Sequence, residues 1–146
     1  MVYRKTNRAF TLVELLIVMS IIGVLAAMGV GSFMTAQMRG RDAQRKSDLK
    51  QVAHSLELYY ADYGRYPDSI TWGSEFTDGK TVYFKVLPTD PSRNGVYTYT
   101  LVPLSSNQKF KLFAKLENTE DKDCIDDDCT TNPNFAVTSA NTNASE

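Results

Sequence analysis

The chain has 146 residues, of which 42% are hydrophobic and 23% charged, and its formal net charge at pH 7 is -1. This length allows one modest domain, and we expect no second one. Residues 1–50 carry eight Lys or Arg and three Asp or Glu, whereas residues 51–146 carry eight and fourteen. A basic first half is therefore followed by an acidic, soluble half. The sequence has a single histidine and neither a nucleophile motif nor a phosphate-binding loop, so it does not indicate an enzyme.

A long uncharged segment follows the basic N-terminus. No residue from Leu15 to Ala36 is charged, and a helix of this length spans roughly the 30 Å of a bilayer core. The run is longer than the apolar part of an ordinary secretory signal. We therefore expect residues 1–9 to be a basic leader peptide and residues 10–36 to form a transmembrane helix.

Glu14 is a carboxylate near the start of this apolar segment. A charge near the bilayer centre costs at least about 2.5 kcal/mol on insertion scales, so Glu14 needs a partner or a wet environment. In one interpretation it lies at the membrane edge, where it snorkels or is protonated. In the other it pairs with a cation from another chain.

The stretch from Arg8 to Val18, RAFTLVELLIV, closely resembles the N-terminal processing and methylation motif of type IV prepilins and type II secretion pseudopilins. The resemblance implies cleavage between Ala9 and Phe10 by a prepilin peptidase, which then N-methylates Phe10. It also implies that Glu14 neutralises the new amino terminus of a neighbouring subunit, and an ammonium and a carboxylate buried together cost less than either alone. Ala9 replaces the glycine that usually precedes the cut, and its small size leads us to expect that processing survives.

Three glycines interrupt the apolar segment at Gly23, Gly29 and Gly31. Gly23 coincides with a glycine at which filament-packed pilin helices often loosen, and Gly31 stands where the family commonly has proline. Each glycine costs a helix about 1 kcal/mol relative to alanine, which favours local loosening. Close packing between helices in a membrane explains the same residues equally well.

Five basic residues follow the apolar segment: Arg39, Arg41, Arg45, Lys46 and Lys50. The positive-inside rule would keep this side in the cytoplasm. The resemblance implies the opposite, a single pass through the inner membrane with the leader in the cytoplasm, followed by a filament at the cell surface or in the periplasm. Acidic residues interrupt the cluster and no aromatic platform accompanies it, so nucleic acid is a disfavoured partner and a solvated face or an intersubunit salt-bridge zone is preferred.

An amphipathic helix is expected over residues 37–63. One face carries Leu49, Val52, Ala53, Leu56, Tyr59, Tyr60 and Tyr63, and the other carries Arg45, Lys46, Lys50, Gln51 and Glu57. Gly64 and Pro67 end the helix. A helix from Phe10 to Tyr63 would be roughly 80 Å long, so its apolar half needs lipid or other copies of the chain. His54 is interpreted as an ordinary surface or packing residue.

Residues 64–146 predict a small β domain. Residues 81–87 and 96–102 are rich in Thr, Val and Tyr, and apolar residues alternate with charged ones from Phe110 to Leu116, which indicates three strands. Turn residues at 88–95 and 105–108 predict an antiparallel meander packed on the amphipathic helix. Residues 59–67, 87–91 and 96–99 are also similar to segments of pseudopilins and pilins. The expected fold class is thus α+β, and the resemblance implies the pilin fold.

An acidic loop surrounds the only two cysteines. Cys124 and Cys129 suit a local disulfide in an oxidising compartment. The nearby carboxylates are Asp121, Asp123, Asp126, Asp127 and Asp128, and such oxygen-rich clusters can hold Ca²⁺ outside the cell, although the EF-hand order is absent. The alternative is a solvated loop without any cofactor. The tail from Thr130 is expected to be mobile.

These patterns indicate a structural function. The leading hypothesis is a subunit of a type IV pilus-like filament that polymerises with itself. Its other expected partners are a prepilin peptidase and methyltransferase, an inner-membrane assembly platform with its ATPase, and membrane lipid before assembly. A pseudopilin of a type II secretion system and a solitary membrane-anchored binding module are the alternatives.

Overall fold

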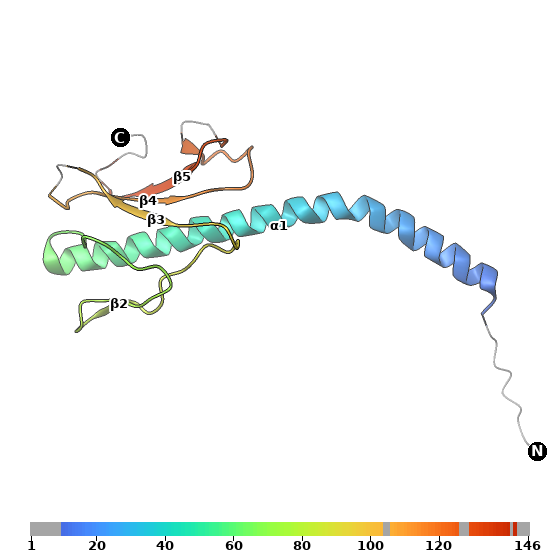
Figure 1. The fold of residues 1–146 in the computed structure, drawn as a ribbon, viewed down its shortest axis with the longest axis horizontal. Helices are drawn as coiled ribbons and strands as arrows, with labels where there is room; N and C mark the ends of the chain where they lie inside the picture. The colour runs from blue at the N-terminus through green and yellow to red at the C-terminus, as the bar shows by residue number, and fades with distance from the viewer. Residues whose placement is uncertain (1–9, 104–105, 126–128, 141, 143–146) are drawn as a thin grey trace, which may run out of the picture. The chain divides into compact units, whose positions relative to one another are not determined.

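The computed structural model describes residues 10–103, 106–125, 129–140 and 142. The chain divides into two compact units, Met1–Gln37 and Met38–Glu146. A helix of 52 residues, α1 (Leu12–Tyr63), contributes to both of them (Figure 1). The strands all belong to the second unit, so the fold is the α+β class that the sequence predicts.

Helix α1 ends where the sequence predicts. Gly64 follows its last residue with a φ of 66°, a conformation that favours glycine, and the Gly64 N–H donates to the Tyr60 carbonyl at 2.7 Å. Among the described residues, no helix taken alone is long and apolar enough to span a membrane. The segments Leu12–Met28 and Val30–Tyr63 meet that requirement when they are taken together, by length and composition only.

The second unit contains two antiparallel sheets. β1 (Phe76–Thr77) pairs with β2 (Val82–Phe84), and β3 (Thr98–Leu101), β4 (Phe110–Ala114) and β5 (Phe135–Thr138) form a sheet in the order β3-β4-β5 (Figure 1). In the larger sheet Leu112 lies opposite Tyr99 on one side and Val137 on the other. β4 is therefore the central strand.

Two sequence predictions about the strands are wrong. The segment 81–87 does not join the meander, because only Val82–Phe84 is extended and it pairs with β1 in a separate sheet. The tail from Thr130, expected to be mobile, supplies β5. Phe135 is only 5% exposed and lies opposite Ala114. The tail is mostly polar, but burial of this aromatic ring and backbone pairing with β4 are enough to order it as a strand.

The core of the second unit lies between α1 and the larger sheet. Leu49, Val52 and Leu56 of the helix are fully buried, as predicted. The predicted alternation in β4 is also confirmed, because every second side chain from Phe110 to Leu116 is buried. Each of the buried Leu, Val and Phe side chains contributes roughly 1.5–3 kcal/mol relative to leaving it exposed, so this contact fixes the domain on its helix.

Candidate assembly site

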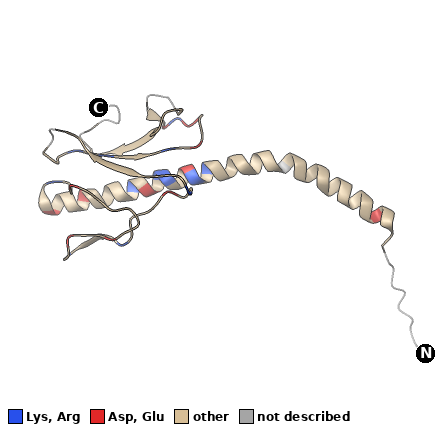
Figure 2. Cartoon of the chain, viewed as in Figure 1, with Lys and Arg blue, Asp and Glu red and all other residues tan. Residues whose placement is uncertain are grey.

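The first unit presents an apolar surface. Every Leu, Ile, Val, Met and Phe from Phe10 to Met34 is exposed, from 48% at Val18 to 86% at Phe10. Figure 2 shows that α1 carries no charged residue over this stretch beyond its first turn. Contiguous apolar area of this extent is costly in water and marks a surface that contacts lipid or protein.

Glu14 lies in the first turn of α1 and closes a capping box with Thr11. Its Oε2 accepts hydrogen bonds from the Thr11 N–H at 2.9 Å and the Thr11 hydroxyl at 2.8 Å, while the Glu14 N–H donates to Thr11 Oγ1 at 3.2 Å. These bonds satisfy N–H groups that have no partner within a helix. Oε1 accepts no hydrogen bond from any described residue. The Thr-x-x-Glu spacing is a sequence signal for this box that our sequence interpretation did not use.

The other residues of the processing motif and the glycines are placed as follows. Phe10 directly precedes the capping box and is exposed, whereas Ala9 lies outside the described residues. Gly23, Gly29 and Gly31 are all within α1. A Cβ atom added at Gly23 or Gly31 would meet nothing within 4 Å. Loosening of the helix at these positions stays a prediction about the assembled state.

The second unit holds a buried arginine on α1. Arg45 is 1% exposed, and its guanidinium binds Asp90 in a two-pronged fashion, with Nε to Oδ2 at 2.8 Å and Nη2 to Oδ1 at 2.9 Å. Nη2 also donates to the Ser92 hydroxyl at 3.0 Å. Gly95 makes room for the Asp90 carboxylate, because a Cβ there would lie 2.0 Å from Oδ1. Arg45 therefore fastens the loop around Asp90 to the helix.

The same arginine reaches the segment that follows β4. Nη1 lies 2.7 Å from Asp42 Oδ1 and 2.8 Å from Glu117 Oε1, and Arg41 forms a second two-pronged pair with Glu117. Asp42 in turn accepts hydrogen bonds from the backbone N–H groups of Glu117 at 2.9 Å and Asn118 at 2.8 Å. We call Arg41, Asp42, Arg45, Asp90 and Glu117 the ionic clamp.

The ionic clamp shifts the pKa values of Glu117, Asp90 and Arg45. The hydrogen bonds from Arg41, which outweigh burial, together with those from Arg45, lower the pKa of Glu117 to about 2. Burial alone would raise the pKa of Asp90, but the Arg45 and Ser92 hydrogen bonds hold it below its ordinary value. The bonds to Asp90 raise the pKa of Arg45, which stays charged. Glu117, Asp90 and Arg45 are thus ionised at neutral pH.

The clamp corrects one sequence prediction. Arg45 was assigned to the solvated face of the helix, yet it continues the buried stripe that runs through Asp42, Arg45, Leu49, Val52 and Leu56 at helical spacing. That spacing was the available signal. Three members of the basic cluster, Arg41, Arg45 and Lys46, pair within one chain with carboxylates distant in sequence.

The acidic loop lies beside the clamp. Cys124 and Cys129 are joined by a disulfide with Cα atoms 5.3 Å apart. Asp121 and Asp123 each accept a hydrogen bond from Lys46, whereas Asp126, Asp127 and Asp128 lie outside the described residues. Within the described part of the chain, no group of three or more His, Cys, Asp or Glu is arranged to hold a metal ion.

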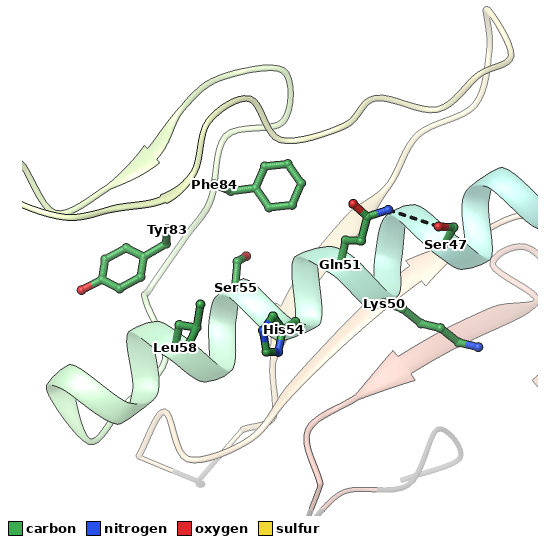
Figure 3. A pocket seen from close by; sticks show the side chains of 8 residues that line it. All are labelled: Ser47, Lys50, Gln51, His54, Ser55, Leu58, Tyr83 and Phe84. Carbon is green, nitrogen blue, oxygen red and sulfur yellow. Dashed lines mark hydrogen bonds between the residues drawn. The ribbon is translucent and has the colours of Figure 1, made fainter.

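A shallow groove of about 460 Å³ is lined by residues of α1 and β2 (Figure 3). Its lining residues are Ser47, Lys50, Gln51, His54, Ser55, Leu58, Tyr83 and Phe84. Gln51 donates to the Ser47 hydroxyl at 3.1 Å, and His54 is exposed on α1.

The fold and the exposed segment define a class of protein in which a small α+β domain is built on a helix whose apolar part needs other molecules to cover it. Residues 4–30 match the family model described as the prokaryotic N-terminal methylation motif. The chain is 32% identical over 103 residues to the type II secretion system core protein G of Pseudomonas aeruginosa. This alignment covers 62% of this chain and 72% of that protein.

Two pilins are also similar. The type IV major pilin protein PilE1 of Neisseria gonorrhoeae is 26% identical over 117 residues, covering 77% of this chain and 71% of that protein. The type IV major pilin protein PilA of Myxococcus xanthus is 36% identical over 66 residues, or 45% of this chain and 30% of that protein. No solved structure matches at a significant level. The chain belongs to the family of type IV pilins and type II secretion pseudopilins, and it is a structural filament subunit.

Proposed function

We propose that this protein is the subunit of a type IV pilus-like filament, assembled from the inner membrane through the apolar part of α1. The observation that carries this proposal is the uninterrupted exposure of apolar side chains from Phe10 to Met34 with a single carboxylate, Glu14, at its start. Before assembly, lipid covers this surface. In the filament, the same segment of other copies covers it.

Maturation precedes assembly in this proposal. A prepilin peptidase removes residues 1–9 on the cytoplasmic side by cutting between Ala9 and Phe10, and the new amino terminus is N-methylated. The match of residues 4–30 to the methylation motif supports this step. The domain that starts at Met38 is then on the outer side of the membrane. An assembly platform and its ATPase extract the mature subunit into the filament.

Glu14 sets the register between subunits in this proposal. Its Oε2 is engaged with Thr11, which holds the carboxylate at the start of the helix, and Oε1 faces no donor among the described residues. This arrangement supports a role in which Oε1 binds the amino terminus of Phe10 on a neighbouring subunit. The attraction is strong where water is scarce, because the effective dielectric constant is low.

A pseudopilus of a type II secretion system is the second candidate. It is favoured by the extent of the alignment with core protein G of Pseudomonas aeruginosa, which covers 72% of that protein. Genes next to that of this chain discriminate the two, since a retraction ATPase indicates a dynamic pilus and an outer-membrane secretion pore indicates a pseudopilus. Both candidates share the same assembly chemistry.

The test replaces Glu14 by Gln, which keeps size and hydrogen bonding but removes the charge. We expect processed protein to accumulate in the membrane and sheared filaments to be lost. Ser20→Ala is the matched control, because among the described residues the Ser20 hydroxyl bonds only to the Ile17 carbonyl of its own helix, at 2.8 Å. Mass spectrometry of the sheared material reports the N-terminus. Normal filament yield from Glu14→Gln, or filaments that retain Met1, would contradict the proposal.

A further inference from the structure

The acidic loop contains a cation that belongs to the chain itself. Lys46 projects from α1 and its Nζ donates to Asp121 Oδ1 at 2.6 Å and to Asp123 Oδ2 at 2.6 Å. The same Nζ lies 5.7 Å from the centroid of the Phe135 ring in β5. One ammonium thus contacts two carboxylates and an aromatic face, three groups that attract a positive charge.

The carboxylate that Lys46 binds also organises the loop. Asp121 Oδ1 accepts a second hydrogen bond from the Asp123 N–H at 3.0 Å, and the Asp121 N–H donates to the Asn118 carbonyl at 3.4 Å. The side chains of Lys46 and Asp121 are 19% and 17% exposed, so the contact is largely shielded from water. Burial opposes the ammonium, but its hydrogen bonds to the two carboxylates keep the pKa of Lys46 above its ordinary value.

A calcium ion would need the same oxygens. Ca²⁺ binds six to eight oxygen ligands at about 2.3–2.6 Å, and a carboxylate bridge is the usual anchor. In the described part of the loop, the two carboxylates that face each other across this position already bind Lys46. A divalent cation between them would lie against an ammonium, and two positive charges a few ångströms apart repel each other.

We propose that Lys46 is the built-in counter-ion of Asp121 and Asp123, that it occupies the place between them that calcium would take, and that this described part of the acidic loop therefore folds without metal. The helix and the loop are joined by this ammonium. Lys46 lies one residue after Arg45, so two neighbouring cations of α1 fasten two different loops to the helix.

The test compares thermal unfolding of the full chain in detergent micelles with excess EDTA and with millimolar calcium. The wild type should unfold at the same midpoint in both. Lys46→Met should lower the midpoint by several degrees and speed proteolysis at residues 118–125. Lys50→Met is the matched control, because Lys50 is exposed one turn later on α1 and should leave both readouts unchanged.

A double variant isolates the interaction. In a chain with Asp121→Asn and Asp123→Asn, Lys46→Met should cause a much smaller further drop in the midpoint, since the ammonium then has no carboxylate to neutralise and keeps only its contact with the Phe135 ring. A rise in the wild-type midpoint with calcium would overturn the proposal, and so would equal stability of the Lys46→Met and Lys50→Met chains. The calcium comparison uses the wild type alone, so it holds even if Lys46→Met does not fold. Neither measurement depends on filament assembly.

Discussion

Replacing Arg45 by Met tests the ionic clamp most directly. The side chain volume is largely kept, but Asp42 and Asp90, whose side chains are 3% and 1% exposed, lose their guanidinium. Removing one partner of a buried ion pair costs about 3–5 kcal/mol, because the remaining charge is left without compensation. Small domains are stable by roughly 5–15 kcal/mol, so we expect a large loss.

Trp72 provides the assay. It is the single tryptophan, and its ring centroid lies 5.3 Å from that of the buried Tyr97, so its fluorescence reports unfolding of the second unit. With about 4–8 °C per kcal/mol for a domain of this size, the midpoint of thermal unfolding should fall by at least about 12 °C. Arg39→Met is the control, because Arg39 is exposed and forms no ion pair with the described residues.

A double variant separates charge from packing. Adding Asp90→Asn to Arg45→Met removes one of the unpaired carboxylates, so the pair of changes should cost less than the sum of the two single changes. A loss below about 1 kcal/mol for Arg45→Met, which is the range of exposed pairs, would refute the reasoning, as would strict additivity.

Two further predictions concern the same unit. The pKa of Glu117 is about 2 in the folded chain against an ordinary 4.5. The contribution of Glu117 to the free energy of unfolding is therefore fully present above pH 4.5 and is lost as the pH falls toward 2. Unfolding followed by Trp72 fluorescence should show this decline in stability with falling pH, and Glu117→Gln should make the decline less steep. Asp48 changes the stability in the opposite direction as the pH falls, because burial raises the pKa of its carboxyl group. Asn134 is fully buried and accepts from the Leu116 N–H at 2.6 Å while donating to the Leu116 and Cys129 carbonyls. Asn134→Ala should therefore cost about 1–3 kcal/mol in urea unfolding, whereas an unchanged midpoint would mean that water replaces the amide.

The sequence by itself determined the elements whose signal is local. The uncharged run from Leu15 to Ala36 and the stripe of Leu49, Val52 and Leu56 are periodic over many residues, and Gly64 ends the helix by its own conformational freedom. The processing motif is also a contiguous string. The alternation in β4 could be recognised for the same reason, since its buried and exposed residues follow each other directly along the chain.

Only the tertiary structure decided which distant residues meet. Arg45 is separated from Asp90 by 45 residues and from Glu117 by 72, so no local pattern shows that these two carboxylates join Asp42 around it and permit its burial. The contact between Lys46 and Asp121 could not be predicted either, because 75 residues separate them. β5 is a weaker case, because Phe135–Thr138 consists of strand-favouring residues, but the run is only four residues long and stands in a polar tail. Pairing with the edge of β4 and burial of Phe135 in the core make it a strand. Charge neutralisation and edge pairing depend on the approach of chain segments in space, which composition and periodicity do not encode.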